Sequence, residues 1–162
     1  MKINNKKANI IAEAMIILGV IIIFAIAGLI SVKLQNDLNA DIQNDTSLSD
    51  ESKAYAQMRT DNQPLIVDNA LLFIICGLTL AAMVAAWFID TSPWFVVVAI
   101  LLLVMVLIAA AIIANAYEEL ASDDDLISAA DQLPKINFIM SHIIEIIIGI
   151  SILIGGILYG KS

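Results

Sequence analysis

Residues 69–117 read NALLFIICGLTLAAMVAAWFIDTSPWFVVVAILLLVMVLIAAAIIANAY, two apolar runs joined by a short polar turn at residues 90–93. Each run has about the 20 residues or more that an α-helix needs to cross the hydrocarbon core of a bilayer. Ser92 is a favoured N-cap residue, and Pro93 suits the first turn of a helix. The stretch therefore predicts a tight antiparallel pair of membrane-spanning helices.

Two further apolar runs of this length flank the pair, which predicts four spans in all. We expect the spans at residues 10–33, 67–89, 93–117 and 136–160, with outer loops at residues 34–66 and 118–135. The first run also has the basic flank of a secretory signal, but its apolar stretch exceeds the ~7 to 15 residues of such signals, so we interpret it as an uncleaved anchor. Residues 1–162 are thus expected to form a single all-α membrane domain, a four-transmembrane-helix bundle with short extramembrane helices in its loops.

The composition excludes several classes of protein. Of the 162 residues, 60% are hydrophobic and 15% are charged, whereas a soluble domain is about half apolar and a quarter charged. The net charge of -8 argues against binding to nucleic acid. The chain lacks a phosphate-binding glycine loop. It also lacks an HExxH motif and a Ser-His-Asp set, since its one histidine lies in a span. We therefore expect no enzyme, no cofactor and no metal.

Basic residues set the expected orientation, because lysine and arginine collect on the inner side of a membrane. Lys2, Lys6 and Lys7 precede the first span and Lys161 follows the last one. Four spans place both termini on the same side, which we take as the inner side of a cytoplasmic or virion membrane. Thirteen of the 16 acids then lie in or beside the two outer loops, against four of the eight bases, so the outer face is strongly acidic.

The first outer loop carries two stripes with a spacing of four residues, which predicts that the first helix projects beyond the lipid. Like charges at this spacing repel each other in an isolated helix, so a basic partner, cations or solvent must compensate the acidic stripe. We expect a separate helix from Asp50 to Arg59, capped by Ser49 and ending before Pro64. The stripes are Leu34, Leu38 and Ile42, and Asp37, Asp41 and Asp45.

The second outer loop predicts one short helix. Ser122 with an acid three residues later is a weak capping-box pattern, and the apolar residues from Leu126 to Leu133 form one face. We expect this helix to lie on the membrane surface or on top of the protein. Asp123, Asp124 and Asp125 lack the alternating ligands and the glycine of a calcium loop, so we interpret them as part of an acidic face that docks a partner.

Ionisable residues inside a span are functional candidates, because a charge in hydrocarbon costs at least a few kcal/mol. Glu13 lies near the inner mouth of the first span, where we expect it to snorkel or to pair with a lysine. His142 and Glu145 are three residues apart and share a face of the fourth span. This pair predicts a proton or ion path, polar glue between helices or subunits, or, least well, a metal site.

Small residues at helical spacing predict close helix packing. On the fourth span the face of His142 and Glu145 continues into glycines, which predicts a seam that faces other helices. A stripe on the second span has the same character, and together these residues favour a compact bundle that forms homo- or hetero-oligomers. The predicted packing positions are Gly77, Ala81, Ala85, Gly149, Gly156 and Gly160.

Three stretches carry a family resemblance: QPLIVDN at residues 63–69, NAYEEL at residues 115–120 and LPKI at residues 133–136. The chain resembles small multi-pass membrane proteins encoded by viruses and prophages of bacteria and archaea, some of which are structural parts of virions. The resemblance covers about the last hundred residues and lends no residue a role. It implies a structural component of a membrane.

These observations favour a non-enzymatic scaffolding subunit of a larger membrane-bound assembly, such as a lipid-containing virion. Its acidic loops would dock other membrane or shell protein subunits. The alternative is an ion- or proton-conducting subunit that uses Glu145 and His142. A holin-like protein that permeabilises membranes is a weaker third interpretation, because compact acidic loops are poorly suited to forming lesions.

Overall fold

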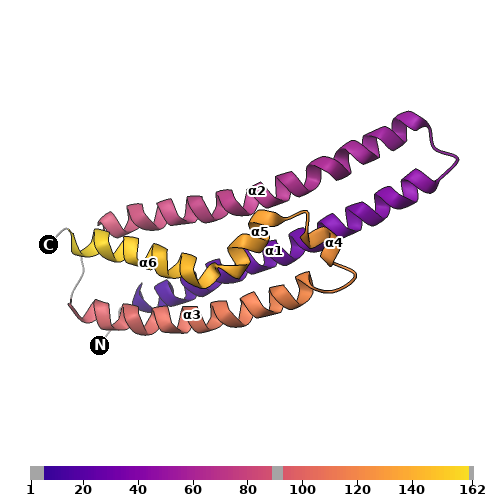
Figure 1. Ribbon diagram of the computed structural model, residues 1–162. Helices are drawn as coiled ribbons and strands as arrows, with labels where there is room; N and C mark the ends of the chain where they lie inside the picture. The colour runs from indigo at the N-terminus through magenta and orange to yellow at the C-terminus, as the bar shows by residue number, and fades with distance from the viewer. Residues whose placement is uncertain (1–5, 89–92, 161–162) are drawn as a thin grey trace.

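A computed structural model describes residues 6–88 and 93–160, and all regular structure in these residues is helical (Figure 1). The expected all-α fold is confirmed. The helices are α1 (Lys6–Asn44), α2 (Asp50–Phe88), α3 (Pro93–Ala121), α4 (Ile127–Ala130), α5 (Pro134–Ser141) and α6 (Ile143–Tyr159). The predicted cap at Ser92 and the side chains of the terminal lysines and of Glu13 lie outside the described part of the chain.

Three helices, α1, α2 and α3, are long and apolar enough to cross a membrane, and the bent pair of α5 and α6 makes a fourth if it counts as one span. The chain is therefore a multi-pass membrane protein. The molecule is elongated, and the beginning of α1 and the end of α6 lie at the same end of it (Figure 1).

The first outer loop is almost entirely helical, and the prediction of a separate helix ending before Pro64 is wrong. α2 runs without interruption from Asp50 through Pro64 to Phe88. A proline inside a helix normally breaks it, but α2 packs along α1, and tertiary packing overrides local propensity. The predicted cap is confirmed, since the Ser49 hydroxyl accepts a hydrogen bond from the Ser52 backbone N–H at 3.3 Å.

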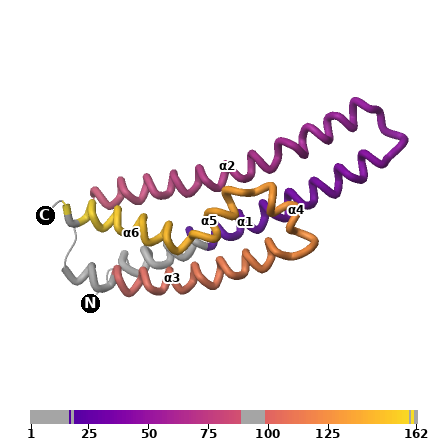
Figure 2. The backbone as a smooth tube through the Cα atoms, viewed as in Figure 1, coloured from indigo at the N-terminus to yellow at the C-terminus, as the bar shows by residue number. Residues whose placement is uncertain are grey.

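The fourth apolar run is broken, so the prediction of one span over residues 136–160 needs correction. α5 and α6 meet at an angle of 70°, and the trace changes direction between them (Figure 2). His142 joins the two helices with φ -116° and ψ 21°, outside the helical region. Its imidazole stacks on the Phe138 ring with centroids 4.4 Å apart.

The bend is accompanied by burial of α5 in the centre of the molecule. α5 packs against α2 and α3, and its residues Ile136, Ile139 and Met140 are buried. Leu29 of α1 and Leu71 of α2 are fully buried in the same core. α5 therefore adds its apolar side chains to the core that α1 and α2 share.

The second outer loop folds onto the protein, which is one of the two placements that we expected. Its helix is shorter than predicted, since α4 covers only Ile127–Ala130 and packs on α1 and α3. The weak capping box is not formed, because Leu126 is the N-cap and makes no side-chain cap bond. Instead the Asp123 backbone carbonyl accepts hydrogen bonds from the N–H groups of Leu126 and Ile127, at 2.9 and 2.8 Å.

Candidate functional site

The most prominent feature of the molecule is a helical hairpin that extends past α3, α4 and α5 (Figure 1). We define the outer hairpin as residues 31–64, which comprise the end of α1, the turn at residues 45–49 and the beginning of α2. Residues 50–64 of α2 are helical, and at ~1.5 Å per residue they reach about 22 Å. The prediction that the first helix projects beyond its apolar segment is confirmed by α1, which continues to Asn44.

A ladder of polar side chains joins the two arms of this hairpin. Its residues on α1 are spaced by four, so they lie on one face of the helix. Because the hydrogen bonds link the arms at four levels, they fix the register of α1 against α2. The bonds run from Gln63 Nε2 to Ser31 Oγ (2.6 Å), from Gln35 Nε2 to Thr60 Oγ1 (3.3 Å), from Asn39 Nδ2 to Gln57 Oε1 (2.8 Å) and from Gln43 Nε2 to the Lys53 carbonyl (2.9 Å).

The predicted docking acids are all exposed. Lys33 Nζ pairs with Asp37 at 2.8 Å within α1, and Asp41 is on the surface one turn further on. Asp45 belongs to the turn, where its Oδ1 accepts hydrogen bonds from the backbone N–H and the hydroxyl of Ser47, at 2.8 and 2.6 Å. These bonds lower the pKa of Asp45 below its ordinary value of 3.8. In the second loop, Asp123, Asp124 and Asp125 are exposed beside α4.

Apolar side chains accompany the acids on the surface of the outer hairpin. Leu34 and Leu38 are 57% and 47% exposed, so the apolar stripe of α1 does not hold the hairpin together. On α2, Tyr55 and Met58 are 65% and 55% exposed. Large exposed apolar side chains beside charges are typical of protein interaction surfaces.

A buried polar cluster seats α5 at the base of the hairpin. Asp68 of α2 is 3% exposed, and its two carboxylate oxygens accept hydrogen bonds from the backbone N–H groups of Ile136 (2.8 Å) and Lys135 (3.2 Å). Lys135 Nζ also donates to Asn69 Oδ1. Since α5 has no cap from its own N-cap residue Leu133, Asp68 supplies that cap from another helix.

A second pair of bonds ties α3 to the same segment. The Tyr117 hydroxyl donates to Asn137 Oδ1 at 2.7 Å, and Asn137 Nδ2 donates to the Ala130 carbonyl at 2.8 Å. Sequence reasoning did not assign a capping role to Asp68. Asp68 and Asn69 stand at the start of an apolar run, where polar residues commonly flank a span, so the sequence carries no specific signal of this cap.

His142, at the junction of α5 and α6, and Glu145 of α6 are both exposed. His142 Nδ1 lies 3.0 Å from Ser141 Oγ and 3.0 Å from the Phe138 carbonyl, so its contacts are local. The structure does not bring the pair into the interior, where Ile143 is buried instead. Among the described residues, no group of three or more His, Cys, Asp or Glu side chains is arranged to hold a metal ion.

The small-residue seam does not face other helices of this chain, and its role in packing between subunits stays a prediction. All six predicted packing positions are exposed. A Cβ added at Gly77, Gly149 or Gly156 would meet nothing within 4 Å. The seam stays open because α6 turns its isoleucine face to the neighbouring helices. The six positions are Gly77, Ala81, Ala85, Gly149, Gly156 and Gly160.

The glycine at which helices do approach closely is Gly28. A Cβ there would lie 2.6 Å from Val67 Cγ1 and 3.6 Å from Ile136 Cδ1. Gly28 therefore allows α1, α2 and α5 to meet.

No protein-family model matches this chain, and searches among curated proteins and among solved structures find no match either.

Proposed function

We propose that this protein is a non-enzymatic membrane subunit that presents the outer hairpin as a docking arm for a basic partner in a larger membrane-bound assembly, such as the membrane of a virion. The observation that carries the proposal is the continuation of α1 and α2, joined by the polar ladder, beyond the other helices. The bent pair of α5 and α6 completes a fourth crossing in this proposal, so both termini lie on the inner side.

The outer hairpin has the properties of a prepared binding surface. Four levels of hydrogen bonds between its arms reduce the conformational freedom that a partner would otherwise have to restrict. Its exposed acids attract a basic surface at long range, which speeds association at low salt. The exposed side chains of Leu34, Leu38 and Tyr55 supply apolar area for the contact itself.

The test compares two charge-matched variants of the full-length protein in mild detergent. The measured quantity is the binding of the partner proteins that copurify with the parent protein. Asp37→Asn/Asp41→Asn removes two acids of the arm, and Glu118→Gln/Glu119→Gln removes two exposed acids at the end of α3. Asp45 is left intact because it shapes the turn. We expect partner binding at low salt to fall about tenfold in the first variant, equivalent to about 1.4 kcal/mol, and less than twofold in the second. Equal binding by both variants contradicts the proposal.

Ion conduction, the alternative function, has less support. Glu145 and His142 are exposed, whereas Ile143, Ile146 and Ile147 of α6 face the interior. We expect liposomes that contain the parent protein and liposomes that contain Glu145→Gln to show the same proton flux. A flux that depends on Glu145 would revive the conducting interpretation.

A further inference from the structure

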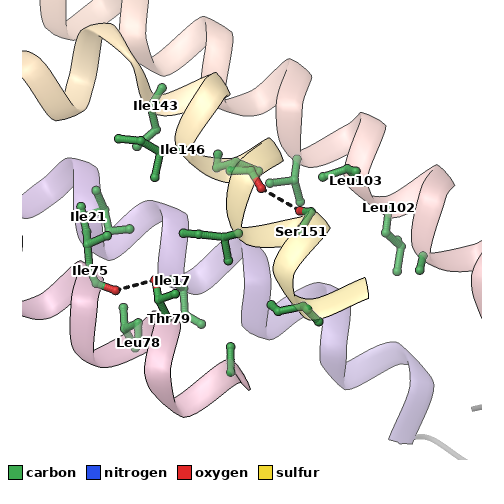
Figure 3. A pocket seen from close by; sticks show the side chains of 16 residues that line it. Ile17, Ile21, Ile75, Leu78, Thr79, Leu102, Leu103, Ile143, Ile146 and Ser151 are labelled. Carbon is green, nitrogen blue, oxygen red and sulfur yellow. Dashed lines mark hydrogen bonds between the residues drawn. The ribbon is translucent and has the colours of Figure 1, made fainter. Parts of the chain in front are cut away.

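α1, α2, α3 and α6 line a cavity in the half of the molecule near the end of α6. There α1 contacts α2 and α3, and α6 contacts the same two helices, so the four form a ring. The cavity of about 350 Å³ occupies the centre, lined by side chains from all four helices (Figure 3). Ile17, Ile75, Leu102 and Ile146 represent the four walls.

The cavity is a consequence of the bend at His142. In the outer half of the molecule, α5 fills the centre with the buried side chains of Ile136, Ile139 and Met140. The 70° bend then directs α6 to the ring, so none of the described helices fills the centre beyond α5. Two of the wall positions, Ala82 and Ala99, carry small side chains that leave the space open.

The walls are apolar, and their hydroxyl groups are already bonded within their own helices. Thr79 Oγ1 donates to the Ile75 carbonyl at 2.8 Å, and Ser151 Oγ donates to the Ile147 carbonyl at 2.7 Å (Figure 3). Among the residues that line the cavity, these are the two with polar side chains. A buried water needs two to four polar partners, and apolar cavities stay dry and accept apolar guests.

We propose that this cavity binds the acyl chain of a membrane lipid. The four walls belong to the apolar segments, so the cavity lies at the depth where the hydrocarbon tails of the bilayer surround the protein. Its volume falls in the range of ~300 to 1,000 Å³ that is typical of ligand sites. A tail inside the ring restores the dispersion contacts that an empty space would forfeit. The inference does not depend on the docking function of the outer hairpin.

Photolabelling tests the proposal on the full-length protein in nanodiscs of phosphatidylcholine that carries a diazirine on its acyl chain. After illumination, peptide mass spectrometry locates the labels. We expect labels on the cavity wall at Ile147 and Ile150, in addition to labels on Ile152, which is 69% exposed and serves as the internal reference.

The matched variants are Ala82→Phe, which places a ring in the cavity, and Ala81→Phe, which places the same ring on the exposed side of α2. We expect Ala82→Phe to lower the wall labels at least fivefold relative to the reference and Ala81→Phe to leave them unchanged. If Ala82→Phe does not fold, as judged by circular dichroism and gel filtration, Ala99→Leu replaces it with the same expectation.

Two results from the parent protein and the cavity-filling variants would overturn the proposal. One is the absence of wall labels in the parent protein while Ile152 is labelled. The other is the same wall labelling in the parent and in a folded cavity-filling variant. Thr79→Val should leave the labels unchanged, since the Thr79 hydroxyl bonds its own helix and not the guest; a loss of wall labels in this variant would contradict an apolar guest.

Discussion

The carboxylate of Asp68 is 3% exposed and caps α5 through two backbone N–H groups that are 67 and 68 residues away in the sequence. Hydrogen bonds to a charged group are stronger than those between neutral groups, and their loss leaves buried donors without an acceptor. Asp68 thus connects α2 to α5, whose apolar side chains are buried in the core.

We predict that Asp68→Asn lowers the free energy of unfolding by about 1–3 kcal/mol, because one amide nitrogen then faces a backbone donor. The measurement is a denaturant titration in mixed micelles. Asp61→Asn is the control, since Asp61 is exposed and accepts a bond from Gln57 on its own helix at 2.8 Å. The control should change the free energy by less than about 0.5 kcal/mol. Equal effects at both positions would remove the special role of Asp68.

Gly28 gives a second prediction at this scale. Gly28→Ala should lower the free energy of unfolding by about 1 kcal/mol or more, because its Cβ would lie 2.6 Å from Val67 Cγ1 and valine is stiff at χ1. Gly19→Ala on the same helix meets nothing within 4 Å and should instead stabilise the protein by up to about 1 kcal/mol. Adding Val67→Ala to Gly28→Ala should restore stability. A double variant no more stable than Gly28→Ala would refute the contact.

Sequence patterns predicted that the loop acids are exposed, but they did not predict which residues each side chain contacts. The acids of the first loop were expected on the surface, and they are exposed. The seam of Gly149 and Gly156 was expected to pack, but spacing shows only which residues share a face and not which neighbour that face meets. The cap by Asp68 depends on a contact between distant parts of the chain, which periodicity does not encode.

Among the elements, the long apolar helices could be predicted because apolar length alone defines a span. The continuity of α2 through Pro64 and the break at His142 could not. Pro64 has the local signature of a helix end, yet packing of α2 along α1 preserves the helix. His142 carries no helix-breaking signature, yet the chain bends there by 70°, where α5 enters the core. In both cases the helix packs against distant parts of the chain, which local patterns do not encode.

The turn between α1 and α2 provides a pH-dependent prediction. Because the hydrogen bonds from Ser47 lower the pKa of Asp45, ionised Asp45 stabilises the turn at neutral pH, and this contribution is lost as the pH falls below the ordinary value of 3.8. We expect Ser47→Ala to raise the pKa of Asp45 toward 3.8, as measured by NMR titration of its carboxyl carbon. Thr46→Ala should leave that pKa as it is in the parent protein. An unchanged pKa in Ser47→Ala would contradict the role of the serine.

For the whole molecule, the proposal of four crossings predicts the accessibility of its ends. A tag at the amino terminus and a tag at the carboxyl terminus should become protease-sensitive from the same side of sealed vesicles. A protease site inserted in the turn at residues 45–49 should be cut from the opposite side. Tags that are cut from opposite sides would exclude an even number of crossings.

The length of α2 has a mechanical consequence. A helix is a stiff rod, and α2 runs without interruption from Asp50, directly after the turn of the outer hairpin, to Phe88 at the end of its apolar segment. In the proposed assembly, the length of the projecting part of α2 would therefore set the distance between the lipid headgroups and a protein layer bound at the tip of the hairpin. Excising one rung of the ladder, four residues from each arm, would shorten that distance by ~6 Å.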